Sequence, residues 1–110
     1  MAINSRQKGK RGEAEIAHIL QAYGFDARRG VQYCGLNGDA DVVGLPGYHL
    51  EVKRVERLNI DTAMEQSIRD ARDNEIPIVC HRRDRKQWLV TMSLKDFMEV
   101  CYGKGGKEDS

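Results

Sequence analysis

The apolar positions in the first quarter of the chain recur at the spacing of a helix. One helical face carries the apolar residues Ile16, Ile19, Leu20 and Tyr23. Ser5 is a suitable amino-terminal cap, and Gly24 is a natural stop because glycine accommodates the backbone that ends a helix. The pattern therefore predicts a first helix that packs this face against the rest of the molecule.

The apolar positions that follow have the shorter spacing of strands. We predict strands at 25–33, 40–45 and 49–55, which are rich in β-branched and aromatic residues. Pro46 and Gly47 separate the last two segments and suit a tight turn. The second and third strands are therefore expected to pair antiparallel.

The helical period returns in the segment 62–74. Thr62 and Glu65 have the spacing of a capping box there, and Met64, Ile68 and Ala71 form the apolar stripe that we expect to be buried. The remaining predicted elements are strands at 76–82 and 87–92 and a short last helix at 94–102, capped by Ser93.

This order of elements predicts an α/β fold with a mixed central sheet of about five strands flanked by helices. The second helix is a crossover between the third and fourth strands, which are therefore expected to be parallel, and the first two helices are expected to cover the sheet. We expect a single domain over residues 1–102. The polar segment 103–110 has nothing to bury and is expected to be a flexible tail.

Composition places the chain among intracellular globular proteins. It has 110 residues, of which 40% are apolar and 32% charged. It has no apolar run of the roughly 18 residues that a membrane span needs, and no apolar segment of signal-peptide length at its amino terminus. We therefore expect a soluble, cytoplasmic protein with no membrane partner. Cys34, Cys80 and Cys101 lack paired spacing and are expected to be reduced thiols, with Cys80 and Cys101 packed among apolar residues.

The segment "GDADVVGLPGYHLEVKR" carries charges where a half-buried hairpin favours neutral residues. Glu51 and Lys53 are two apart in a predicted strand and so share one face, about 6.5–7 Å apart. The turn at Pro46 brings Asp41 back toward Glu51. Two carboxylates this close repel each other, and a divalent cation with a preference for oxygen ligands is the usual remedy. The alternative is a solvated cross-strand charge pair.

Glu13 is a third candidate acid, on the first helix. It lies three residues before Ile16 and seven before Leu20, and so shares the face that these residues turn toward the sheet. The alternative is an acid in an early helical turn that faces solvent and is favoured by the helix dipole. Glu15 points elsewhere and fits that alternative.

Four segments in order resemble the Holliday junction resolvases of the PD-(D/E)XK nuclease superfamily. They are "KGKRGE" (8–13), "YGFDARR" (23–29), "DADVVG" (39–44) and "LEVKR" (50–54). The resemblance covers residues 8–92. Ala40 replaces the proline of the superfamily name, and the loop "YCGLNGD" lacks the serine of the resolvase loop, so the nuclease assignment is firmer than the resolvase assignment.

The resemblance implies a restriction-endonuclease-like core, a homodimer and a Mg²⁺-dependent endonuclease acting on DNA, with four-way junctions as substrate. Asp41 and Glu51 would hold Mg²⁺, for which Mn²⁺ could substitute, and Lys53 would position or activate the attacking water. Glu13 would be the helix acid of the catalytic set. The residues expected to contact nucleic acid are Lys8, Lys10, Arg11, Arg28, Arg29 and Gln66.

The sequence leaves two alternatives open and gives no role to the histidines. The basic residues Arg82, Arg83, Arg85 and Lys86 form either a hairpin tip that reaches a second run of phosphates or a solvated loop. The histidines His18, His49 and His81 lack metal-ligand spacing and are assigned no chemistry. Two other functions remain possible: a less structure-specific nuclease acting on flaps, nicks or single strands, and a catalytically silent nucleic-acid-binding module.

Overall fold

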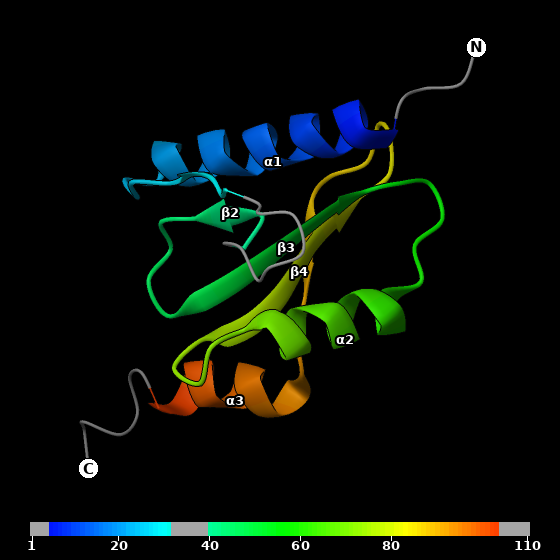
Figure 1. The fold of residues 1–110 in the computed structure, drawn as a ribbon. Helices are drawn as coiled ribbons and strands as arrows, with labels where there is room; N and C mark the ends of the chain where they lie inside the picture. The colour runs from blue at the N-terminus through cyan, green and yellow to red at the C-terminus, as the bar shows by residue number, and fades with distance from the viewer. Residues whose placement is uncertain (1–4, 32–39, 104–110) are drawn as a thin grey trace.

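The computed structural model describes residues 5–31 and 40–103, with side chains from Gly9 onward. Within these ranges the chain forms three helices and five strands (Figure 1). In chain order they are α1 (Ser5–Ala22), β1 (Arg28–Arg29), β2 (Val42–Val43), β3 (Tyr48–Arg54), α2 (Ile60–Asp70), β4 (Ile76–Arg82), β5 (Leu89–Thr91) and α3 (Leu94–Gly103). The predicted α/β class and order of elements are confirmed.

The five strands form one mixed sheet in the order β1-β2-β3-β4-β5. Strands β3 and β4 are parallel, and the other neighbouring pairs are antiparallel. Helix α2 supplies the predicted crossover between β3 and β4. The register pairs Val42 with Leu50 and Lys53 with His81.

The first two helices cover opposite faces of this sheet, as Figure 1 shows. Helix α1 packs on the face of Leu50 and Val52, where Ile16 and Ala17 join the main core. Gly12 permits this close approach, because a Cβ there would lie 3.4 Å from a Val52 methyl and 3.2 Å from the Arg54 Cβ. The core consists of Ile16, Ala17, Ala27, Val42, Leu50, Val52, Ile78 and Cys80.

The connection between β2 and β3 is the tight turn that the sequence predicts. Tyr48 donates its backbone N–H to the Leu45 carbonyl at 3.3 Å, and Gly47 has φ +86°. Pro46 and Gly47 thus occupy the two central positions, where a restricted and a left-handed backbone are respectively favoured. The turn returns β2 along β3 and places Asp41 next to the middle of β3.

The predicted buried stripe and cap of the second helix are wrong. Asn59 caps α2 and accepts the Thr62 N–H at 3.0 Å, so the helix begins before the proposed capping box. The fully buried residues of α2 are Ala63 and Ser67, whereas Ile68 is 55% exposed. Ser67 donates to the Ile78 carbonyl at 3.1 Å, which satisfies its hydroxyl and lets the helix lie close to β4.

Several smaller predictions also need correction. In α1, Ile16 is buried but Ile19 is exposed, because the helix turns Gly12 and Ala17 to the sheet instead. Tyr23 lies just after the end of the helix and is also exposed. Strand β1 has only two residues of the predicted segment 25–33, whose last two residues lie outside the described ranges. The loop 33–39 with Cys34 and the tail from residue 104 also lie outside the described ranges.

The two cysteines within the described ranges differ. Burial among core residues raises the pKa of the Cys80 thiol to about 12, which keeps it protonated, as expected for a packed thiol. Cys101 is exposed on α3, contrary to the prediction. Across residues 5–31 and 40–103, no helix combines the length and hydrophobicity that a bilayer span requires.

Candidate active site

Asp41 and Glu51 meet where β2 runs beside β3. The Asp41 backbone N–H donates to the Leu50 carbonyl at 3.0 Å, and its carboxylate Oδ2 accepts the Val52 N–H at 2.9 Å. Glu51 is almost fully buried, and its carboxyl group lies within hydrogen-bonding reach of Asp41. The turn and the register therefore bring two carboxyl groups together, as the sequence predicted.

This crowding changes the chemistry of Asp41. Burial raises its pKa, and the negative charges of Glu51 and Glu13 raise it further, against the lowering effect of the Val52 hydrogen bond. The result is a pKa of about 7 instead of the usual 3.8. A divalent cation between the carboxylates would relieve the repulsion that adds to the effect of burial on this pKa.

Glu13 faces this pair from α1. It contributes to the raised pKa of Asp41, and its Oε1 accepts a hydrogen bond from Arg29 Nε at 3.1 Å. Its side chain is 19% exposed, so it is not a freely solvated acid of the first turns. The sequence-based expectation that Glu13 faces the sheet describes its position correctly.

A hollow of about 530 Å³ opens beside these acids. It lies between the amino-terminal half of α1, the strands β1 and β3, Asp41 just before β2, and helix α2. The predicted residues that line it are Lys10, Glu13, Arg29, Asp41, Lys53 and Gln66. Charged groups of both signs thus surround one cavity. Glu51 is buried next to Asp41 and is not among the residues that line it.

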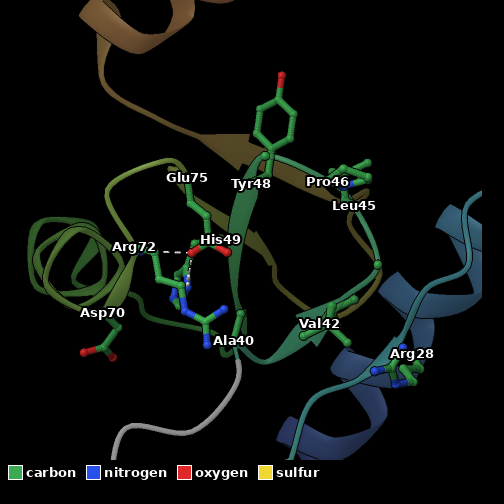
Figure 2. A pocket seen from close by; sticks show the side chains of 13 residues that line it. Arg28, Ala40, Val42, Leu45, Pro46, Tyr48, His49, Asp70, Arg72 and Glu75 are labelled. Atoms are coloured by element: carbon green, nitrogen blue, oxygen red, sulfur yellow. Dashed lines mark hydrogen bonds and ion pairs between the residues drawn. The ribbon is translucent and has the colours of Figure 1, made fainter.

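Other predicted residues lie elsewhere. Arg28 and Arg29 are neighbours in β1 and point to opposite sides, so Arg28 lines a different hollow, of about 350 Å³, at the β2–β3 turn. Figure 2 shows this second hollow, with Arg28 at its edge. Arg11 is exposed on α1 and does not line either cavity. Lys8 belongs to α1, but its side chain lies outside the described residues.

The sequence reasoning missed a buried partner of Glu51. His49 is 4% exposed, and its Nε2 lies 2.8 Å from Glu51 Oε2. Burial lowers the pKa of His49, but the hydrogen bond and charge of Glu51 and the charges of Glu75 and Asp70 outweigh burial and raise it. The signal was available, because His49 is two residues before Glu51 and so shares its strand face.

The sequence reasoning also misplaced Glu15, which is not a solvated acid. It accepts hydrogen bonds from Arg82 Nε at 3.2 Å and from Trp88 Nε1 at 3.1 Å, and it pairs with Arg54 Nη1 at 3.2 Å. Arg54 also pairs with Asp84 at 3.3 Å, and the Arg82 guanidinium lies 5.6 Å from the Trp88 ring centroid. These contacts connect α1 to the carboxyl-terminal ends of β3 and β4, so Arg82 helps to hold the fold together.

The donor set at Asp41 and Glu51 suits a hard divalent cation. Two carboxylates offer oxygen ligands only, and Mg²⁺ is commonly bound by one or two carboxylates together with water and substrate phosphate. Among residues 5–31 and 40–103, no cluster of three or more His, Cys, Asp or Glu forms a preassembled metal site. Asp41 and Glu51 by themselves fit an ion that completes its coordination with non-protein oxygens.

The raised pKa of Asp41 predicts an unusual pH dependence for the protein without metal. The folded protein keeps the Asp41 proton up to about pH 7, whereas an unfolded chain loses it near the usual 3.8. Between these values the folded state binds more protons, so this group lowers the free energy of unfolding as pH rises, by at most about 1.4 kcal/mol per pH unit. Denaturation by urea at pH 4.5 to 8 checks this.

The Asp41→Asn variant removes that contribution and leaves every other titrating group in the chain. We expect the variant to gain stability relative to wild type as pH rises from about 4 to 7, and the difference to level off above that range. A stability difference that is flat with pH would contradict the raised pKa.

This arrangement, a mixed five-stranded sheet with paired carboxylates at β2 and β3 and a lysine two residues further on, defines a PD-(D/E)XK-type nuclease fold. The family model described as "Phage putative PDDEXK endonuclease" matches residues 4–105. The chain belongs to this family.

Two individual proteins are similar to the chain. Protein D14 of Escherichia phage T5 is 31% identical over 122 residues, an alignment that covers 89% of this chain and 76% of the phage protein. The structure of Archaeoglobus fulgidus Hjc, a Holliday junction resolvase from an archaeal hyperthermophile, superimposes with a TM-score of 0.57 at 27% identity. That match covers 77% of this chain and 72% of the resolvase. The resemblance drawn from the four sequence segments is confirmed, and the fold is that of the resolvase.

Membership of this family implies a divalent metal ion and DNA as the partner of the chain.

Proposed function

We propose that the chain is a metal-dependent endonuclease that hydrolyses DNA phosphodiester bonds at four-way junctions. The observation that carries the endonuclease proposal is the pair of carboxyl groups of Asp41 and Glu51, held together beside a cavity that Lys53 and basic residues line. Junctions as substrate are supported by the similarity in fold to the archaeal resolvase. The domain would comprise residues 1–102.

Asp41 and Glu51 would hold Mg²⁺, with Mn²⁺ as a substitute. When bound, the ion would polarise the scissile phosphate and lower the pKa of a coordinated water. The phosphodiester is otherwise protected by its own negative oxygens. The Val52 amide holds the Asp41 carboxylate in place.

Lys53 and Glu13 complete the catalytic set. Lys53 lines the cavity from β3 and would stabilise the attacking water or the negative charge that develops on phosphate. Glu13 would accept a hydrogen bond from water at the site, and its ion pair with Arg29 sets the position of both side chains. Arg29 keeps its remaining N–H groups for phosphate.

DNA affinity would come from cations around the same cavity, because the carboxylates repel the backbone. Lys10 and Arg29 line it, and Gln66 reaches it from α2. Arg11, Arg28 and Lys8 would contact phosphates further along the DNA. Each neutralised phosphate releases counterions, so binding is expected to weaken steeply with salt.

A homodimer would place two such sites on the two strands to be cut. Helix α3 is the surface that we assign to this contact. None of its residues is buried, and it exposes the large apolar side chains Leu94, Phe97, Met98 and Tyr102. An exposed apolar patch of this kind is typical of a protein interface.

The dimer surface gives a direct prediction. Phe97→Glu should convert the dimer to a monomer, because a buried, unpaired charge would oppose association. Light scattering coupled to gel filtration checks the mass. The matched control is Ile68→Glu, which changes an apolar residue of α2 of similar exposure and should leave the dimer intact. A Phe97→Glu protein that remains dimeric would place the interface elsewhere.

Substrate class is tested with labelled four-way junction, flap, nicked duplex, intact duplex and single strand, each incubated with protein and Mg²⁺. Preferred, symmetric cutting of the junction is the expected result. Equal cutting of flaps, nicks or single strands would indicate a less specific nuclease. Binding without cleavage in Mg²⁺ and in Mn²⁺ would indicate a catalytically silent DNA-binding module.

A further inference from the structure

His49 is a buried polar residue that the proposed chemistry does not use. Its side chain lies on the face of β3 that also carries Glu51 and Lys53, beneath α2. We propose that His49 is a positioning residue, which fixes the Glu51 carboxylate so that one defined oxygen is presented to the divalent cation. This inference rests on the proposed metal site and goes beyond it, because it assigns a role to a residue outside the predicted catalytic set.

The hydrogen bond itself supports this role. His49 Nε2 lies 2.8 Å from Glu51 Oε2, and both side chains are 5% exposed. An ionised carboxylate can only accept, so the imidazole donates from Nε2. With Oε2 held in this way, the carboxylate cannot rotate freely, and Oε1 is left for the cation. Hydrogen bonds that orient ligating groups are a recurring requirement of protein metal sites.

His49 is held in turn from its other side. Its Nδ1 lies 3.8 Å from Glu75 Oε1, and the same oxygen accepts the Arg72 backbone N–H at 2.9 Å. Figure 2 shows the Glu75 carboxylate between Arg72 and His49, at the start of β4. The loop after α2 therefore anchors a chain of contacts that runs through Glu75 and His49 to Glu51.

A role in packing alone does not account for these residues. Glu51 pairs in register with Val79, which is fully buried, so the carboxylate has an apolar neighbour on the same face of the sheet. Taking a carboxylate and an imidazole out of water carries a desolvation cost, and apolar residues of similar volume would fill the same space without it. The pair is thus better explained by what Glu51 binds than by stability.

The experiment measures binding of Mn²⁺ alone by isothermal titration calorimetry, without DNA. We expect His49→Leu, which keeps bulk but has no donor, to weaken Mn²⁺ binding roughly 10- to 100-fold. His49→Gln restores an N–H donor and should bind within a few fold of wild type. The matched control is Ser67→Ala, which removes a buried hydrogen bond of the same α2–sheet interface without touching Glu51, and should leave Mn²⁺ affinity unchanged.

A measurement on the unaltered protein covers the case in which His49→Leu does not fold. Long-range ¹H–¹⁵N spectra at fixed pH should show the His49 ring nitrogens shifting when Mg²⁺ is added, while those of His81, which bonds to Thr91, stay in place.

The outcomes separate this inference from the proposed function. Wild-type affinity in folded His49→Leu, or a His49 resonance that does not respond to saturating Mg²⁺, would overturn the positioning role and leave the metal site standing. A wild-type protein that binds neither Mn²⁺ nor Mg²⁺ would overturn the proposed metal site, and the positioning role with it.

Discussion

Asp41→Asn is expected to reduce DNA cleavage by a factor on the order of 10³ or more, without weakening DNA binding. The variant keeps the shape of the side chain and an oxygen that can accept the Val52 N–H, but it removes the negative charge. A neutral amide is a poor ligand for Mg²⁺ beside a single remaining carboxylate. Single-turnover cleavage of the labelled junction measures the rate, and gel shift in EDTA at pH 8, where Asp41 is ionised, measures binding.

Binding should hold or improve because one charge that repels the phosphate backbone is removed. The matched control is Asp73→Asn, the same change at an exposed position between α2 and β4, which should cleave at the wild-type rate. Cleavage by Asp41→Asn within tenfold of wild type would show that this carboxylate is not a metal ligand. Loss of both binding and cleavage would instead indicate a misfolded variant, which its denaturation curve reveals.

The sequence predicted the convergence of Asp41 and Glu51 because the cause is local. A proline-glycine turn of fixed length sets how β2 returns along β3, and the strand period of two sets which side chains share a face. The same reasoning predicted that β3 and β4 are parallel, since a helix must connect them. Where the position of a residue follows from turn length and strand period, it can be predicted from the amino-acid sequence.

The missed features depend on contacts between distant segments. Glu15 looks like a solvent-facing acid until Arg82 and Trp88 are brought to it from more than sixty residues away. The apolar pattern predicted the wrong buried face for helix α2, because Ile68 is more apolar than Ser67. The smaller Ser67 is the buried residue because α2 lies close to β4. The sequence does not show that Arg28 and Arg29 line different hollows, because this depends on the register of β1 against β2.

His49 is an intermediate case. Its shared face with Glu51 follows from the strand period, but its burial does not, because that depends on how α2 covers β3. A histidine two residues from a candidate metal ligand therefore merits attention even without metal-ligand spacing. The sequence spacing typical of metal ligands identifies residues that bind the ion directly. It does not identify residues that hold such a ligand in place.

Gly44→Ala is expected to destabilise the protein by about 3 kcal/mol or more. Gly44 follows β2 directly and has φ +109°, and a Cβ there would lie 2.2 Å from the Asp26 carbonyl oxygen and 2.6 Å from the Ala27 Cα. Both neighbours are backbone atoms and cannot rotate away. The segment before β1 would have to move, and with it the strand pairing that places Arg29 and Asp41 at the site. Urea denaturation measures the loss.

Gly47→Ala separates the two causes of this loss of stability, which are backbone strain at a positive φ and collision of the added Cβ with backbone atoms. Gly47 also has a positive φ, +86°, but a Cβ there would meet nothing within 4 Å, so its substitution introduces backbone strain of about 1–2 kcal/mol without a collision. We therefore expect Gly44→Ala to be clearly the more destabilising change. Equal losses at the two positions would mean that β1 can shift away from β2 at little cost. In that case the position of Arg29 relative to Asp41 would be adjustable, and DNA binding could alter it.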